Sequence, residues 1–412
     1  MEKYDPDIVI DVQGLYKVFG PHPEHALEEF KKGKSKKDLS LTNHILALCG
    51  IDLKINRGKI FVVMGLSGSG KSTFLRCLNR LVEPTAGSII IDGTDVTNLP
   101  KKHLLHLRSQ KLGMVFQHFG LLPHRNVIEN VVFGLEVKKE KRALRYQKAH
   151  EALNLVGLGE WETRMPAELS GGMQQRVGFA RALALNPPIL LMDEPFSGLD
   201  PLIRKEMQRE LLSLQQRLQK TIVFITHDLD EALTLGDRIM ILKDGRIEQE
   251  GIAKEIVFSP ASEYIDAFIH DVDLLKVLPA EDFMETELSV FQIEGKLIGP
   301  HALEVQENSP VFVIDEKERY IGSLSSEKFR DVLTRGHLAL REHSVQGTVS
   351  LDPRDPVRNA LAYLTRPPFA VAITNGDHHL IGAITWKSFF SGLGQRESNY
   401  SYSGRERWAK SR

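Results

Sequence analysis

The segment "GLSGSGKST", Gly65 to Thr73, constrains the fold more than any other part of the sequence. It fits the pattern G-x-x-x-x-G-K-[ST], follows the strand-like run "IFVVM" and opens a helical pattern. Glycines in such a loop let backbone amides surround phosphate oxygens, and the helix N-terminus adds positive potential. The pattern alone also arises by chance in turns rich in glycine and serine. The strand before it and the helix after it are the context that a phosphate-binding loop requires.

An acidic segment, "ILLMDEP", supplies the other half of a nucleotide site. Lys71 is expected to reach the β- and γ-phosphates, while Ser72 and Asp193 are expected to hold Mg²⁺. Glu194 can orient or deprotonate an attacking water. Two ordinary strand-end carboxylates are the alternative, but acids at the end of an apolar strand are costly unless paired or used. The other expected nucleotide contacts of the loop are Gly65, Leu66, Ser67, Gly68, Ser69, Gly70 and Thr73.

A second glycine-rich turn, "LSGGMQQR" at Leu169 to Arg176, contains no lysine. Its amides and the Ser170 hydroxyl also suit a phosphate. A simpler role is an N-cap, in which Ser170 caps a helix that starts near Met173. Both roles are compatible, because a capped helix would direct its dipole at the nucleotide. The sequence therefore predicts two phosphate-binding turns, of which only the first contains a lysine.

Length and composition limit the remaining possibilities. With 412 residues, two or three domains of roughly 150 residues are expected. Lys and Arg number 53 and Asp and Glu 54, so bulk charge does not favour nucleic-acid binding. Cys49 and Cys77 are too few for a disulfide framework and are expected to be small apolar residues in a reducing cytosol. No run reaches the roughly 18 apolar residues of a membrane helix, and the N-terminus is unlike a signal peptide. A soluble or peripheral protein on the cytoplasmic side is expected.

Strands and helices alternate through most of the first 270 residues, which predicts a layered α/β domain. Residues 21 to about 45 form a polar, irregular insert with a lysine-rich cluster at 31–37. The pattern is helical from about 100 to 185. Beyond about 270, two segments resemble each other, starting at "SPVFVIDEKERYIGSLSSEKF" and "PFAVAITNGDHHLIGAITWKSF". Each predicts strand, turn, strand and helix, which is an internal repeat of two units.

The motifs together resemble a known family. The phosphate loop, "VFQ", "LSGGMQQR", "LLMDEP", "SGLD" and "THD" follow in that order, over residues from about 8 to 270. This set is similar to the nucleotide-binding subunit of an ATP-binding cassette (ABC) transporter. The resemblance implies a P-loop NTPase fold with a RecA-like parallel sheet, a helical subdomain and antiparallel strands. It also implies an ATPase that uses ATP and Mg²⁺ beneath an integral-membrane permease.

The resemblance offers an explanation for the two phosphate-binding turns. Subunits of this family pair head to tail, so that the loop of one and the signature turn of the other enclose one ATP. Such reciprocity is what a two-fold dimer produces. The resemblance thus implies a homodimer with contacts in trans from Ser170, Gly171, Gly172, Met173 and Asp200.

Three further roles are carried over by motif. Phe19 in "KVFG" would stack on adenine, the alternative being an aromatic packed at a strand end. Gln117 in "VFQ" would contact Mg²⁺ and the γ-phosphate. His227 in "THD" would contact the γ-phosphate and act with Glu194 in catalysis, although a lone histidine is more often structural.

The insert, "CLNRLVEPTAG", "MVFQHFGLLPHRNV", "DEPFSGLDPLIRKEMQ" and the repeat together resemble the ATPase subunit of glycine betaine/proline betaine importers. This implies a cassette at 1–270, with a permease and a substrate-binding protein as partners and no nucleic acid. An importer for another solute, such as an amino acid, and a soluble ABC ATPase of translation or repair are the alternatives. The solute does not touch this subunit in such importers.

The repeat, at 271–340 and 341–396, resembles a tandem pair of cystathionine-β-synthase (CBS) domains, followed by a basic tail at 397–412. Nucleotide-binding CBS units usually carry Asp three residues after a Ser or Thr, but Lys328 and Ser388 stand here. A cyclic dinucleotide, anionic lipid or no ligand stays open, as does a role in dimerisation alone. Salt would screen lipid docking of the 31–37 lysines or of the tail residues Arg405, Arg407, Lys410 and Arg412.

Overall fold

The structure is a computed structural model that describes residues 5–116, 120–270, 273–292, 296–298, 310–335, 349–366 and 368–394. The chain forms two compact units, Met1–Val272 and Asp273–Arg412. Among the described residues, no helix combines the length and apolar character needed to cross a membrane. Gln117 and the basic tail at 397–412 lie outside the described residues, as do parts of the repeat at 299–309 and 336–348.

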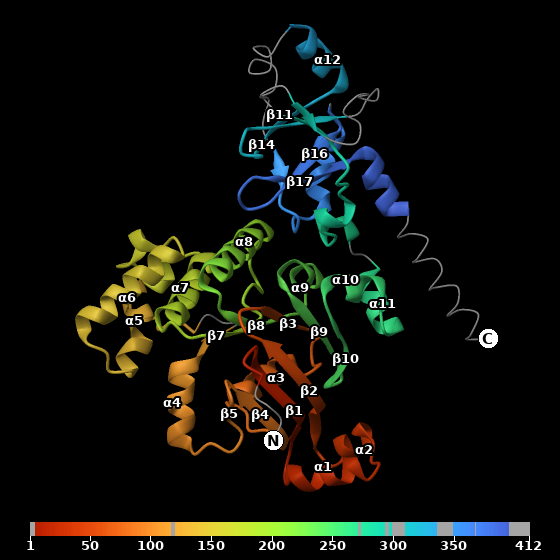
Figure 1. The fold of residues 1–412 in the computed structure, drawn as a ribbon. Coiled ribbons are helices and arrows are strands. Elements are labelled where there is room, and N and C mark those ends of the chain that lie inside the picture. Colours follow the sequence, from red (N-terminus) through yellow and green to blue (C-terminus); the bar gives the residue numbers. More distant parts are fainter. Residues whose placement is uncertain are drawn as a thin grey trace, which may run out of the picture. The chain divides into compact units, whose positions relative to one another are not determined.

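The first unit is built on a six-stranded sheet (Figure 1). Its strands are Ile60–Met64 (β3), Leu112–Val115 (β6), Ile189–Asp193 (β7), Thr221–Thr226 (β8), Arg238–Lys243 (β9) and Arg246–Gly251 (β10). They lie in the order β10-β9-β3-β8-β7-β6. All neighbours are parallel except β10, which forms an antiparallel hairpin with β9. Strands β3, β7 and β8 are buried at every residue, as parallel strands covered on both faces require.

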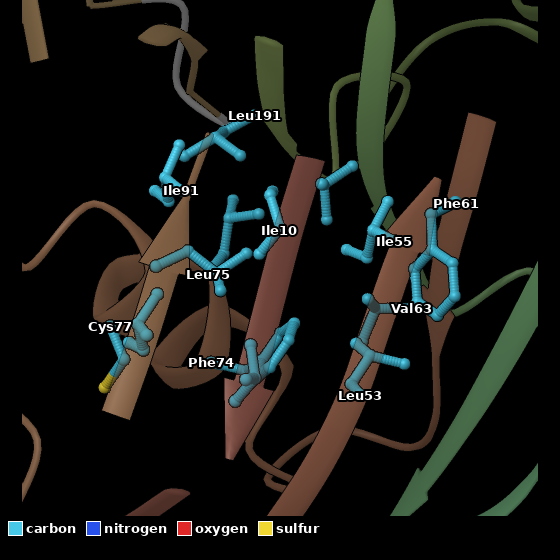
Figure 2. Close-up of a cluster of buried hydrophobic side chains, with 14 of the residues drawn as sticks. Ile10, Leu53, Ile55, Phe61, Val63, Phe74, Leu75, Cys77, Ile91 and Leu191 are labelled. Carbon is cyan, nitrogen blue, oxygen red and sulfur yellow. The ribbon is translucent and has the colours of Figure 1, made fainter. Parts of the chain in front are cut away.

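A second, antiparallel sheet completes the core. It consists of Ile8–Phe19 (β1), Ile45–Asn56 (β2), Ala86–Ile91 (β4) and Thr94–Asp95 (β5), in the order β2-β1-β4-β5. Apolar side chains of both sheets and of the helix Lys71–Leu78 (α3) form one cluster, of which Ile10, Phe61, Phe74 and Leu191 are members. Figure 2 shows Phe74 and Leu75 of α3 between the strands of this cluster. Because α3 starts at the phosphate loop, this core anchors the loop.

Eight further described helices of the first unit follow α3 in the sequence. They are Lys101–Lys111 (α4), Val127–Val137 (α5), Arg142–Leu155 (α6), Gly171–Ala184 (α7), Pro201–Leu218 (α8), Leu229–Leu235 (α9), Ala253–Phe258 (α10) and Glu263–Ile269 (α11). Helices α5, α6 and α7 pack on one another as a helical group. The helical pattern expected from 100 to 185 is interrupted by β6. A four-residue strand is too short to show its own period, and it is defined by its pairing with β7.

The insert at 21–45 is helical where an irregular segment was expected. It forms Pro23–Lys31 (α1) and Lys36–Leu41 (α2), which lie together beyond the end of the β1 and β2 pair (Figure 1). Leu27 and Leu39 are buried in a small cluster with Val18 and Leu46. A reciprocal cap between Ser35 and Asp38 starts α2. A few well-spaced apolar residues within a polar stretch were enough to fix two helices.

The second unit contains two sheets. One comprises Ser289–Gln292 (β11), Lys296–Ile298 (β12), Val311–Ile314 (β13) and Tyr320–Leu324 (β14), and the other Ser350–Leu351 (β15), Ala370–Thr374 (β16) and Leu380–Thr385 (β17). Helix Ser326–Arg335 (α12) follows β14, and a helical segment at 386–394 follows β17. The short helix Leu361–Leu364 (α14) precedes β16.

The two halves of the repeat have the same strand register. Val313 pairs with Gly322 in the first half, and Ile373 pairs with Gly382 in the second. A register shift follows each of these pairs, immediately after Val313 and immediately after Ile373. The sequence similarity at an offset of about 60 residues therefore corresponds to a repeated strand–strand–helix structure.

Candidate nucleotide-binding site

Three neighbouring parallel strands end at the same edge of the central sheet. The phosphate loop follows β3, Glu194 follows β7, and His227 follows β8. Ligand sites of open parallel sheets lie at the carboxyl ends of their strands. The topology thus brings the phosphate loop to residues that stand more than 100 positions later in the sequence.

Glycine is required at two points of the phosphate loop. Gly65 has φ +153°, and a Cβ atom there would lie 2.2 Å from the carbonyl oxygen of Leu242. Gly70 has φ +105°, and its Cβ would lie 2.6 Å from the carbonyl oxygen of Ala47. Both contacts are with backbone, which cannot move aside like a flexible side chain. The loop is therefore held against β9 and β2 in a shape that only glycine permits.

Lys71 is buried at the base of this loop. Its Nζ donates to the carbonyl oxygens of Gly65 at 2.8 Å and Leu66 at 3.0 Å, and lies 3.9 Å from Glu194 Oε1. Burial lowers the pKa of the Lys71 ammonium, while the carboxylates of Glu194 and Asp193 oppose that change. The loop thus fixes a cation beneath its backbone amides, which suits a bound anion.

Ser72 and Asp193 provide two oxygen ligands side by side. The Ser72 hydroxyl donates to Asp193 Oδ1 at 2.8 Å, and Asp193 is buried. Hydroxyl and carboxylate oxygens fit Mg²⁺, which commonly takes one or two protein ligands together with phosphates and water. In the described part of the chain, no group of three or more His, Cys, Asp or Glu side chains suits a metal. The donor set therefore fits Mg²⁺ shared with a nucleotide.

Glu194 and His227 form a pair at the open end of the site. His227 Nδ1 lies 3.2 Å from Glu194 Oε2, within hydrogen-bond distance. Glu194 has φ +44°, a left-handed conformation that a residue with a side chain adopts at a cost. Its backbone amide donates to the carbonyl oxygen of Ile225 at 3.2 Å, which ties the turn to β8. Strain of this kind is concentrated at functional sites.

An open cavity of about 630 Å³ adjoins the phosphate loop. Phe19 lines it from the end of β1, and Lys17 Nζ lies 4.8 Å from the centroid of the Phe19 ring. Phe19 lies at the end of its strand with 39% of its surface exposed. The residues of the cavity wall are Phe19, Lys36, Ser40, His44, Ile45, Leu46, Ala47, Ser67, Gly68, Gly70, Lys71, Ser72, Thr73, Glu194, Asp244 and Gly245.

The signature turn lies outside this cavity. Ser170 caps α7, its hydroxyl accepting from the Met173 amide at 3.3 Å, as the capping hypothesis expected. Ser170 and Gly171 are exposed, whereas a Cβ at Gly172 would lie 2.7 Å from Ile203. Asp200 is exposed at the N-terminus of α8. In one chain, the described structure does not bring these residues to the phosphate loop.

Comparison with known proteins identifies the family. The family model described as "ABC transporter" matches residues 48–197. The "Glycine betaine/proline betaine transport system ATP-binding protein ProV" of Salmonella typhimurium is 40% identical over 397 residues, covering 95% of this chain and 99% of the relative. The chain belongs to the ATP-binding subunits of ABC transporters. It is therefore an ABC ATPase, and its cassette binds ATP.

Two further comparisons agree with this assignment. A "Trimethylamine N-oxide transport system ATP-binding protein TmoW" from Pelagibacter ubique is 48% identical and covers 78% of this chain and 96% of the relative. A solved "Dimeric structure of a post-hydrolysis state of the ATP-binding cassette MJ0796 bound to ADP and Pi" is 35% identical. It covers 59% of this chain and 98% of that chain, with a TM-score of 0.51. The fold expected for the cassette is confirmed.

The ABC site contains side chains that the sequence analysis did not name. Arg76 Nη2 lies 3.5 Å from Asp193 Oδ2, and its position four residues after Ser72 on α3 could have indicated this. Glu231 accepts from the Thr226 hydroxyl at 2.6 Å, and burial raises the pKa of its carboxyl. Lys36, from the insert, had no motif to identify it.

Proposed function

We propose that the chain energises import of glycine betaine, proline betaine or a related methylated ammonium osmolyte, as a homodimer on the cytoplasmic face of the membrane beneath a permease. The observation that carries this proposal is the combination of a site that joins the phosphate loop to Asp193, Glu194 and His227 with near full-length similarity to an ATP-binding protein of betaine transport. The 48% identity to a trimethylamine N-oxide transport protein supports the class of methylated amines. No residue of this chain is proposed to contact the solute.

The separation of the signature turn from the phosphate loop supports head-to-tail pairing. Ser170 and Gly171 are exposed at a capped helix N-terminus, where amides and dipole suit the γ-phosphate held by a partner. Gly172, Met173 and Asp200 are proposed to complete that contact. Two copies related by a two-fold axis would form two such composite sites. The similar MJ0796 structure is described as dimeric, in agreement with this arrangement.

The chemistry proposed for each site follows from its geometry. Phe19 would stack on the base, the loop amides and Lys71 would hold the phosphates, and Ser72 and Asp193 would hold Mg²⁺ together with Gln117. Mg²⁺ would neutralise phosphate charge when bound. Glu194 would orient and deprotonate the attacking water, and His227, 3.2 Å away, would position that carboxylate and contact the γ-phosphate.

The second unit is proposed to be a regulatory CBS pair. Its support is the shared register of the two halves. The hydroxyls at the two helix starts serve as caps, since Lys328 N donates to Ser325 Oγ and Ser388 N to Thr385 Oγ1. In return, the Ser388 hydroxyl oxygen accepts a hydrogen bond from the Thr385 amide at 3.0 Å. With these groups used locally and no Asp present, a cyclic dinucleotide, anionic lipid or ionic strength is a better candidate input than AMP.

Uptake of labelled glycine betaine tests the proposal, in cells that lack their own osmolyte importers and express this chain with its neighbouring transporter genes. Uptake that requires Glu194, is lost in Glu194→Gln and rises with osmolarity is the expected result. An assembled complex that hydrolyses ATP without taking up betaine would refute the solute class. Deletion of 273–412 tests regulation, because loss of assembly with unchanged salt dependence would show a dimerisation scaffold instead.

A further inference from the structure

The helical insert lies beside the nucleotide cavity. The chain leaves the antiparallel sheet at Phe19, the proposed base-stacking residue, and re-enters it at Ile45, which pairs directly with Phe19. Everything between these two positions is the insert. Its helices therefore start and end at the base side of the cavity, and Lys36, Ser40 and His44 line the cavity wall.

Lys36 connects the insert to another part of the cavity wall. Its Nζ donates to the carbonyl oxygen of Asp244, in the turn between β9 and β10. The next residue, Gly245, donates its amide to the carbonyl oxygen of Ser69 in the phosphate loop. An ammonium group has three donors, so one bond to Asp244 leaves two for a ligand. Lys36 is half-buried, whereas the neighbouring Lys37 is exposed and does not line the cavity.

His44 is held in one orientation beside Phe19. Its Nδ1 lies 2.9 Å from the Thr42 hydroxyl, and its Nε2 contacts the carbonyl oxygen of Pro21. The ring packs on Gly20, where a Cβ would lie 2.7 Å from the His44 ring. A ring fixed at both nitrogens and packed on the residue after Phe19 makes a rigid wall rather than a mobile loop.

We infer that the insert is a wall of the ATP site, in which Lys36 and Ser40 contact the ribose and α-phosphate and His44 bounds the base beside Phe19. The inference rests on the proposed placement of ATP, with its base at Phe19 and its phosphates at the loop. The oxygen-rich ribose and α-phosphate lie between these ends, so an ammonium and a hydroxyl at the same cavity wall complement them. The insert thereby acts in nucleotide affinity, and Lys36 is distinguished from the other lysines of the 31–37 cluster.

The test compares Lys36→Met with Lys37→Met in the full-length protein. The two changes remove the same charge from the same helix, but only Lys36 lines the cavity. Isothermal titration measures Kd for ADP and for a non-hydrolysable ATP analogue. We expect Lys36→Met to raise both Kd values about tenfold or more, as loss of one hydrogen bond between charged groups predicts. The equal effect on both nucleotides follows because they share the base, ribose and α-phosphate.

Controls separate the possible results. Lys37→Met should stay within about twofold of the wild type. Ser40→Ala, on the exposed side of α2, should weaken both ligands without altering the thermal unfolding midpoint. Lys71→Met should weaken the ATP analogue more than ADP. Equal losses of nucleotide affinity in Lys36→Met and Lys37→Met would overturn the inference. So would an unchanged affinity in Lys36→Met while Lys71→Met fails to bind. Either result would leave the proposed function standing. A wild-type protein that binds neither nucleotide would overturn the proposed function with it.

Discussion

Replacing Gly65 with alanine should destabilise the cassette more than the same change at Gly68. Both residues have left-handed φ values, +153° at Gly65 and +82° at Gly68. That conformation costs an L-residue roughly 1–2 kcal/mol. At Gly65 the new Cβ would also lie 2.2 Å from the carbonyl oxygen of Leu242 and 2.7 Å from Ser69 Oγ, whereas at Gly68 it would meet nothing within 4 Å. Forced overpacking adds about 1–3 kcal/mol.

We therefore expect Gly68→Ala to lower the free energy of unfolding by about 1–2 kcal/mol and Gly65→Ala by about 2–5 kcal/mol. Urea denaturation followed by tryptophan fluorescence measures both, provided that the slopes match the wild type. Relief of that contact would have to move Gly65, whose carbonyl oxygen accepts from Lys71, so ATP affinity should fall together with stability. Equal losses of stability in the two variants would refute the reasoning, because they would show that the contact with β9 carries no cost.

Three further predictions follow from individual side chains. Glu194→Gln should lower kcat for ATP about 100-fold or more, the usual scale of general base catalysis, with the Kd for ATP retained; hydrolysis at the wild-type rate would exclude the role of base. Hydrogen bonds from Lys111 and then Arg57 lower the pKa of the Asp92 carboxyl to about 2. The wild type should therefore have a higher free energy of unfolding than Asp92→Asn, with the full difference at pH 7. The difference should shrink as the pH falls below about 4 toward 2, and urea titrations at each pH would measure it. Burial raises the pKa of the Cys77 thiol to about 12, so iodoacetamide at pH 8 should label it only after unfolding, as mass spectrometry would detect.

Local patterns predicted much of the fold, because the segments that define it carry strong signals. The glycine loop was predicted because it stands between "IFVVM" and α3, and β7 because its short apolar run ends in two acids. Strand β6 was missed because its four residues, Leu112–Val115, are defined by pairing with β7. The sequence predicts an irregular insert, because its few apolar residues do not form a helical pattern. Those residues, such as Leu39, are recognisable as core residues only from their packing on β1 and β2.

The candidate site shows the same limit. Motifs named the residues at the strand ends, and the parallel topology brought Lys71, Glu194 and His227 together as expected. Motifs could not name Lys36 or Asp244, because each reaches the cavity through tertiary packing rather than through a fixed spacing from the loop. Spacing in the sequence identifies site residues that share one loop or follow one strand. Site residues that come from other parts of the chain can be identified only from the folded structure.

The uneven distribution of charge between the two phosphate-binding turns has a consequence for turnover. Lys71 supplies a buried cation in its own chain, whereas Ser170 to Met173, which we propose to contact a partner's nucleotide, have only a hydroxyl and neutral amides to offer. Charged hydrogen bonds contribute about 1.5–3 kcal/mol and neutral ones about 0.5–1.5 kcal/mol. Binding to one chain should therefore be governed by the lysine, and closure of the proposed dimer by the weaker neutral contacts. A second lysine in the signature turn would strengthen closure but would also retain the phosphates after hydrolysis. In the proposed dimer, a neutral turn would instead let the two chains separate once the γ-phosphate is cleaved, as a repeating transport cycle requires.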